Sequence, residues 1–177
     1  WNTETLEKVA EIETPVLYTW DPRARRHSIG GIRSLAFSPD GNELAIGGIG
    51  KIGNIDHLGG PARLEVFDWQ KGERRLEIED NKKKGLIEQI IWSPNKEWIL
   101  TAGGDHNGFL TFYDVETGDL VHQDGQSGHI HEISVGPDFG ELFIAAHERV
   151  ARWTMEATST DETPPEPDES TDNAAGK

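Results

Sequence analysis

The chain has 177 residues, of which 34% are hydrophobic, and this is enough for one domain with a half-buried β core. Its net charge of −15 at pH 7 repels phosphate backbones and anionic lipid, so we expect neither nucleic-acid nor membrane binding. The absence of cysteine excludes disulfides and thiol catalysis, and no apolar run is long enough to cross a bilayer.

The pattern of apolar residues along the chain is typical of strands. Apolar and polar residues alternate with a period of two, as in Glu43-Leu44-Ala45-Ile46 and Leu64-Glu65-Val66, which is how a strand covers one core face. Asp40-Gly41, Asn107-Gly108 and Thr117-Gly118 fall between such segments, where glycine or asparagine supplies the positive φ of tight turns. The sequence therefore predicts an all-β fold of antiparallel hairpins.

Two sequence marks recur three times in the same order, at intervals of about 40 to 55 residues. The first mark combines a bulky apolar residue with a turn, and its copies are Phe37-Ser38-Pro39-Asp40-Gly41, Trp92-Ser93-Pro94-Asn95 and Val135-Gly136-Pro137-Asp138. The second mark lies in a later strand, and its copies are Leu64-Glu65-Val66-Phe67-Asp68, Leu110-Thr111-Phe112-Tyr113-Asp114 and Val150-Ala151-Arg152-Trp153-Thr154. Each repeat thus reads as four strands, and such units bury their faces by stacking on one another.

These marks resemble the WD40 repeat family. The Ser-Pro-Asp-Gly turn after the first strand, the aromatic-aspartate pair that closes the third strand, and Asp114-Val115-Glu116-Thr117-Gly118 all look like that family's repeat. The opening Trp1-Asn2-Thr3-Glu4-Thr5 matches the last of these segments, so the chain starts inside a preceding blade. The resemblance covers residues 1–14 and 26–155 and implies a partial β-propeller whose remaining blades are missing from this chain.

The resemblance gives an order of units along the chain. It predicts about three four-stranded antiparallel blades, part of a preceding blade and a disordered acidic tail. The expected units are the end of a preceding blade at 1–14, an inter-blade loop at 15–31, a blade at 32–80, a blade at 81–124, a last and incomplete blade at 125–155, and the tail at 156–177. That tail is rich in Thr, Ser, Pro, Asp and Glu and lacks the apolar content needed to fold.

The repeats depart from the family pattern at its polar positions. Where the family often has Gly-His, this chain has His27-Ser28, Lys82-Lys83 and Gly125-Gln126, so the family's histidine-centred hydrogen-bond network is absent or altered. We therefore expect apolar packing and turns to stabilise the repeats. The residues expected inside are Ile32, Leu35, Phe37, Leu44, Ile46, Val66, Ile90, Trp92, Phe112, Tyr113, Ile133, Val135, Ile144 and Trp153.

Few motifs suggest chemistry. Gly48-Ile49-Gly50-Lys51-Ile52-Gly53 fits a dinucleotide-binding pattern, but the glycines and Pro61 that follow break the helix that such a site needs, so we expect a loop. His129 and His131 would project to the same side of a strand, yet no spacing specifies a third metal ligand. The segment Asp105-His106-Asn107-Gly108 lacks the later acidic residues of a calcium loop and is expected to form a hairpin turn. We expect no catalytic residue, no cofactor and no metal.

The remaining candidates form a surface. In propellers of this kind, the loops between blades and those between the second and third strands emerge on one face. Basic residues gathered there on an otherwise acidic protein could steer an acidic partner. The residues expected on this face are Arg23, Arg25, Arg26, Lys51, His57, Lys82, Lys83, Lys84, Asp105, His106, Asn107 and His129.

The functional expectation is a scaffold that holds a protein or peptide partner, without catalysis by this segment. The alternative is a propeller enzyme or a ligand-binding propeller whose active groups lie in sequence upstream of Trp1.

Overall fold

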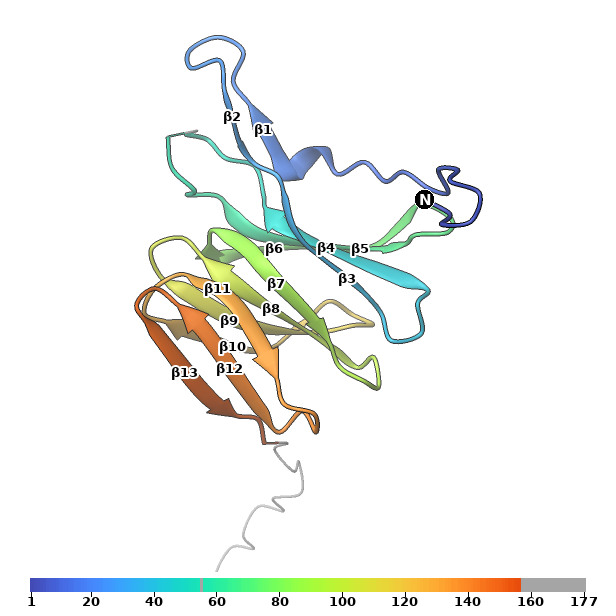
Figure 1. Ribbon diagram of the computed structural model, residues 1–177. Coiled ribbons are helices and arrows are strands. Elements are labelled where there is room, and N and C mark those ends of the chain that lie inside the picture. The colour runs from blue at the N-terminus through green and yellow to red at the C-terminus, as the bar shows by residue number, and fades with distance from the viewer. Residues whose placement is uncertain (55, 157–177) are drawn as a thin grey trace, which may run out of the picture.

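The computed structural model describes residues 1–54 and 56–156, and in this part of the chain it consists of strands and one short 3-10 helix, η1 (Pro15–Leu17) (Figure 1). The strands are β1 (Tyr18–Trp20), β2 (Ser28–Gly30), β3 (Ile32–Phe37), β4 (Glu43–Ile49), β5 (Pro61–Asp68), β6 (Glu73–Lys84), β7 (Leu86–Trp92), β8 (Trp98–Gly104), β9 (Gly108–Asp114), β10 (Leu120–Gln126), β11 (Ile130–Val135), β12 (Glu141–Ala146) and β13 (Arg149–Thr154). The predicted all-β class is confirmed. The acidic tail expected at 156–177 lies outside the described residues, apart from Glu156. None of the described helices is long and apolar enough to span a membrane.

The strands form four antiparallel sheets in which neighbours in sequence are neighbours in space. The orders are β1-β2, β3-β4-β5-β6, β7-β8-β9-β10 and β11-β12-β13. Short turns join β3 to β4, β5 to β6, β7 to β8 and β9 to β10, at what we call the turn end of the sheets. The connections from β4 to β5, from β6 to β7 and from β8 to β9 lie at the other end, which we call the loop end (Figure 1).

The three larger sheets have the same strand register, so residues at equivalent positions of the sequence repeats occupy equivalent positions in the sheets. Trp92 pairs with Ile99, which pairs with Tyr113. The equivalent rows in the other two sheets are Phe37, Leu44 and Phe67, and Val135, Leu142 and Trp153. Each first strand also carries a register shift at the same place, between Ile32 and Ser34, Ile87 and Gln89, and Ile130 and Glu132. Side-chain alternation alone does not show these bulges.

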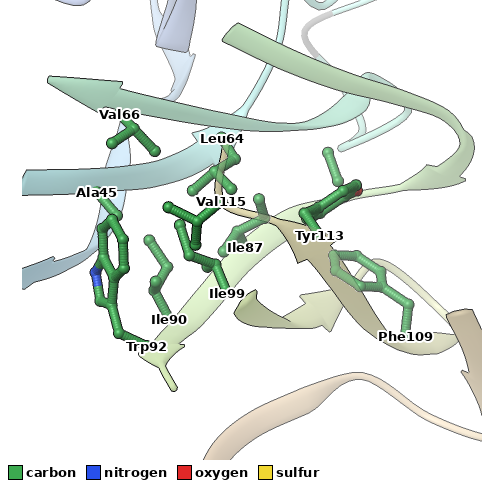
Figure 2. Close-up of a cluster of buried hydrophobic side chains, with 11 residues drawn as sticks. Ala45, Leu64, Val66, Ile87, Ile90, Trp92, Ile99, Phe109, Tyr113 and Val115 are labelled. Carbon is green, nitrogen blue, oxygen red and sulfur yellow. The ribbon is translucent and has the colours of Figure 1, made fainter. Parts of the chain in front are cut away.

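The sheets pack face to face in chain order, and a core lies at each junction. Trp92 is 6% exposed and reaches across the first junction, where its Nε1 donates a hydrogen bond to the Ala36 carbonyl at 3.0 Å. The first core consists of Ala45, Ala62, Leu64, Val66, Ile87, Ile90, Trp92, Ile99, Phe109, Tyr113 and Val115 (Figure 2). The second core consists of Leu100, Ala102, Leu110, Ile130, Ile133, Leu142 and Ile144.

Half of the expected core residues are buried, and those of β3 are exposed. Ile46, Val66, Ile90, Trp92, Tyr113, Ile133 and Ile144 are buried, and Leu44, Phe112, Val135 and Trp153 are half-buried. The prediction is wrong for Ile32, Leu35 and Phe37, which are 46%, 59% and 57% exposed. Strand alternation turns Ser34 and Ala36 toward the first core, so Leu35 and Phe37 lie on the opposite face. Their equivalents Ile90 and Trp92 are buried because that face of β7 meets β3.

The amino-terminal residues form a turn, a short helix and a hairpin before the first large sheet. Residues 1–14 contain no strand, and Asn2 Oδ1 accepts hydrogen bonds from two backbone N–H groups of a turn. Residues 15–31, expected as a loop, contain η1 and the β1-β2 hairpin. Leu17 from η1 is 1% exposed and packs against Ile46 and Phe67, so this segment covers part of the outer face of the first large sheet.

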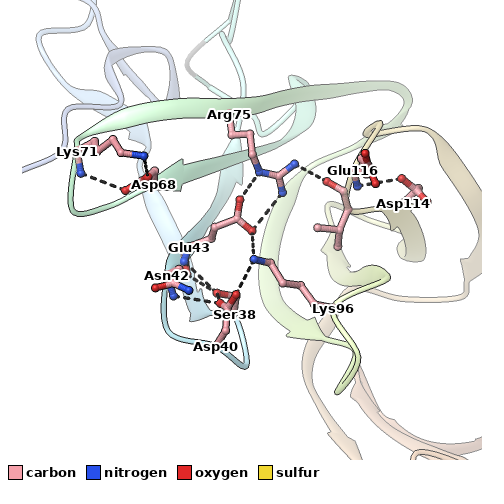
Figure 3. Close-up of polar contacts among 11 residues, drawn as sticks. Ser38, Asp40, Asn42, Glu43, Asp68, Lys71, Arg75, Lys96, Asp114 and Glu116 are labelled. Atoms are coloured by element: carbon pink, nitrogen blue, oxygen red, sulfur yellow. Dashed lines mark hydrogen bonds and ion pairs between the residues drawn. The ribbon is translucent and has the colours of Figure 1, made fainter.

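Ion pairs link the first two large sheets at the turn end (Figure 3). Lys96, in the turn after β7, donates to Asp40 Oδ2 at 2.9 Å and lies 2.8 Å from Glu43 Oε2. Arg75 pairs with Glu43 and donates to the Val115 carbonyl at 2.7 Å. These contacts cross the same junction as the first core, and they involve turn residues that the repeat pattern places side by side.

Asp40 gives this junction an expected pH dependence. Hydrogen bonds from the Ser38 hydroxyl and from Lys96 hold the pKa of Asp40 well below its ordinary value of 3.8. A lowered folded-state pKa contributes stability above the ordinary value, and that stability is lost as the pH falls. Asp40→Asn should therefore lower the thermal midpoint at neutral pH and weaken its decline below about pH 4. Thermal melts of both proteins between neutral pH and about pH 2 measure this, and parallel curves over that range would contradict it.

Candidate functional site

A cavity of about 620 Å³ opens at the loop end, at the junction between the first two large sheets. We call it the lysine groove. Its walls come from the end of β6, the connection from β8 to β9, and the end of β10. The residues that line it are Lys82, Lys83, Lys84, Asp105, His106, Asn107, Gly108, Phe109, Gly125, Gln126 and Ser127. Six of the residues expected on a partner-binding face thus lie around one groove.

The lysines occupy a bulge in β6. The pairing with β5 passes from Ala62 opposite Asp80 to Pro61 opposite Lys84, so residues 81–83 have no partner on β5. Asp80 Oδ1 accepts hydrogen bonds from the backbone N–H groups of Lys82 at 2.9 Å and Lys83 at 3.2 Å. This is the local turn that an aspartate side chain favours. Because a bulge interrupts the normal alternation of a strand, three consecutive lysines can line one groove.

A partly buried polar cluster lies beside the bulge and joins the two sheets. The Gln123 side-chain amide, on β10, donates to Asp80 Oδ2 and to Thr111 Oγ1, the latter at 3.1 Å. Burial, and then the negative charge of Asp80, raise the pKa of the Tyr113 hydroxyl. Both carboxylate oxygens of Asp80 therefore have partners, and this carboxylate fixes β6 relative to β9 and β10.

The wall of the lysine groove opposite the lysines is the short connection from β8 to β9. Asp105 donates its backbone N–H to the Asn107 carbonyl at 3.2 Å, which closes a tight hairpin connection, as the sequence predicts. His106 and Asn107 are exposed, and Asp105 is half-buried. Gly85, which alone joins β6 to β7, has a φ of +110° and lies against the backbone of Gly104, so the two walls meet closely at the base of the groove.

The charge around the lysine groove is opposite to that of the chain. None of its three lysines forms an ion pair with a carboxylate of the described residues, and its lining contains one acidic residue, Asp105. The chain as a whole has a charge of −15. Unpaired ammonium groups in a concave site create a local positive potential there, which attracts anionic groups.

The arginines of the expected face lie elsewhere. Arg23, Arg25 and Arg26 belong to the β1-β2 connection, and Arg25 pairs with Asp56 at 2.7 Å, so its charge is compensated. A second cavity of about 400 Å³ lies beside Arg25 and shares no lining residue with the lysine groove. Lys51 and His57, in the connection from β4 to β5, are exposed and line neither cavity. The residues expected on one face are therefore divided between two separate cavities and positions outside both.

His129 belongs to a third place, a cluster of imidazoles. It is 7% exposed, its Nε2 lies 3.3 Å from Glu88 Oε1, and its ring centroid lies 4.8 Å from that of His131 and 5.8 Å from that of His147. In the part of the chain that the structure describes, no group of three or more His, Cys, Asp or Glu side chains is placed to hold a metal ion. The glycine-rich segment 48–53 ends β4 and leads into residues without a described helix.

The sequence interpretation missed the residues that shape the groove. Asp80, Thr111 and Gln123 carry no motif, and their contacts depend on how the two sheets pack. One local signal was present, because an aspartate followed by asparagine and lysines favours a side-chain-capped turn rather than a continuous strand.

The fold and this site define an all-β protein of stacked antiparallel sheets with a cation-lined groove at a sheet junction. Comparison with models of known protein families and with curated proteins finds no match for the chain.

Proposed function

We propose that this chain is part of a WD40-type β-propeller that acts as a scaffold and binds a protein or peptide partner at its loop end, without catalysis by this segment. Two features support the propeller assignment: the common register of the three larger sheets and their face-to-face packing in chain order. The proposed blades are the four-stranded sheets β3-β6 and β7-β10 and the three-stranded sheet β11-β13.

The binding role rests on one observation, the lysine groove. Two of its cations come from a bulge and the third from the residue after it, and the half-buried Asp80 carboxylate holds the backbone of Lys82 and Lys83. A backbone that is already held in place loses less conformational entropy on binding than a mobile one, which favours a recognition site over a merely solvated surface.

Affinity capture with the full chain tests this proposal. A partner protein should be retained in a saturable manner by the wild-type chain, and its retention should fall in Lys82→Glu/Lys83→Glu/Lys84→Glu. Arg23→Glu/Arg25→Glu/Arg26→Glu makes the same change of net charge in the connection between β1 and β2. Quantitative mass spectrometry compares the three baits. The proposal fails if no protein is retained in a saturable manner, or if every retained protein is captured equally by all three baits.

A further inference from the structure

The chemistry of the lysine groove specifies the class of partner, and this inference rests on the proposed scaffold function. Three ammonium groups, from Lys82, Lys83 and Lys84, line one cavity together with the exposed His106 and Asn107. The lining also includes Gly125, and the Lys83 ammonium lies close to that glycine. A cavity of about 620 Å³ has the size of a site for a small ligand or a short peptide segment.

The type of cation narrows the choice of ligand. A lysine ammonium is a compact point charge with freely rotating donors, whereas an arginine guanidinium is a planar fork that binds a single phosphate or carboxylate in a bidentate manner. Three adjacent lysines therefore match several anionic groups in succession better than one oxyanion of fixed geometry. Aspartate and glutamate side chains along an extended peptide provide such a succession.

The charge of the rest of the chain argues against a long polyanion. A nucleic acid extends well beyond one cavity, and its phosphates would lie against a chain with a charge of −15. A short acidic peptide can place its carboxylates in the groove without extending over the acidic surface around it. We propose that the lysine groove binds an acidic peptide segment in extended conformation, with Asp80 as the positioning residue that holds the lysine-bearing bulge.

Asp80 acts through the backbone rather than through contact with the ligand. Its Oδ1 accepts the N–H groups of Lys82 and Lys83, and its Oδ2 accepts the Gln123 amide. Loss of these hydrogen bonds frees residues 81–83, which have no partner on β5. The two consequences of removing Asp80 have opposite signs: the loss of a negative charge strengthens anion binding, and the loss of order in the bulge weakens it.

Fluorescence polarisation with the full chain tests the partner class. The probe is a labelled eight-residue peptide of alternating Glu and Asp, and its control has Gln and Asn at the same positions. The acidic peptide should bind, with an affinity that falls as salt rises, and Lys82→Gln/Lys83→Gln/Lys84→Gln should weaken it by about tenfold or more. The control variant Arg23→Gln/Arg26→Gln/Lys51→Gln makes the same change of charge and should remain within about twofold of wild type.

Three results would overturn the partner class. They are equal binding of the acidic and amide peptides, equal weakening in the two triple variants, and tighter lysine-dependent binding of a single-stranded oligonucleotide than of the acidic peptide. If a captured protein depends on the lysines while the acidic and amide peptides bind equally, the scaffold proposal stands and this inference alone fails.

Asp80→Ala and Asp80→Asn test the positioning role. Asp80→Ala should weaken acidic-peptide binding although it removes a negative charge, and Asp80→Asn, which keeps an acceptor oxygen, should bind at least as well as wild type. Hydrogen exchange should show faster exchange at residues 81–84 in Asp80→Ala, while circular dichroism and the thermal midpoint establish that the variant is folded. Tighter peptide binding by a folded Asp80→Ala would contradict the positioning role.

Discussion

Trp92→Ala should lower the free energy of unfolding by about 3 to 5 kcal/mol, the largest loss we expect from one core substitution. The indole is 6% exposed and fills the first core (Figure 2), where it touches side chains from both sheets. Its truncation leaves a cavity and removes the hydrogen bond to the Ala36 carbonyl. Urea denaturation followed by circular dichroism measures the loss.

Phe37→Ala is the matched control, because Phe37 holds the same position in the preceding sheet. Its side chain is 57% exposed and has an edge contact with Trp69, so truncation should cost less than about 1 kcal/mol. Trp92→Phe keeps most of the packing and loses the hydrogen bond, so its cost should lie between those of the other two variants. Equal losses for Phe37→Ala and Trp92→Ala would contradict the assignment of the two faces.

Phe37 and Trp92 also show which structural features could be predicted from the sequence and which could not. The repeat marks placed Phe37 and Trp92 in the same position of a strand, and the common register confirms that equivalence. Their burial differs because burial depends on what covers a face, and the pattern of one strand does not contain that information. Turn chemistry was more local: Gly41 and Gly118 have φ values of +72° and +78°, as expected for residues that only glycine accommodates easily.

The candidate site, too, was predicted from the sequence in some parts and not in others. Lys82, Lys83 and Lys84 were expected beside Asp105, His106 and Asn107 from loop positions in the repeat, and one cavity does contain all six. The arginines were expected on the same face, but the hairpin that carries them was read as a loop, so its direction could not be predicted. The bulge at Asp80 required the pairing of β5 and β6 and the approach of Gln123, both of which are tertiary features.

The apolar-polar alternation also gave a wrong prediction of exposure for the charged residues of β5. Glu65 was read as the solvent-facing member of an apolar-polar alternation, yet it is 1% exposed and Arg63 is 2% exposed. Arg63 Nε donates to Glu65 Oε1 at 2.6 Å and its Nη1 to Glu79 Oε1 at 2.7 Å. A strand buried on both faces can keep this alternation if its polar residues pair with one another, and the sequence does not distinguish that case from a solvated face.

Glu65→Ala should therefore lower the free energy of unfolding by about 3 kcal/mol, because it leaves the buried Arg63 guanidinium without its closest carboxylate. Glu79 and Glu77 still neutralise part of that charge, which places the loss at the low end for a broken buried pair. Glu77→Ala is the control: its side chain is 42% exposed, so its removal should cost less than about 1 kcal/mol. Arg63→Met/Glu65→Leu removes both charges and should be more stable than Glu65→Ala. Urea denaturation of the wild type and the three variants measures their free energies of unfolding. A double variant less stable than Glu65→Ala would mean that lost packing, rather than an uncompensated charge, causes the destabilisation in this part of β5.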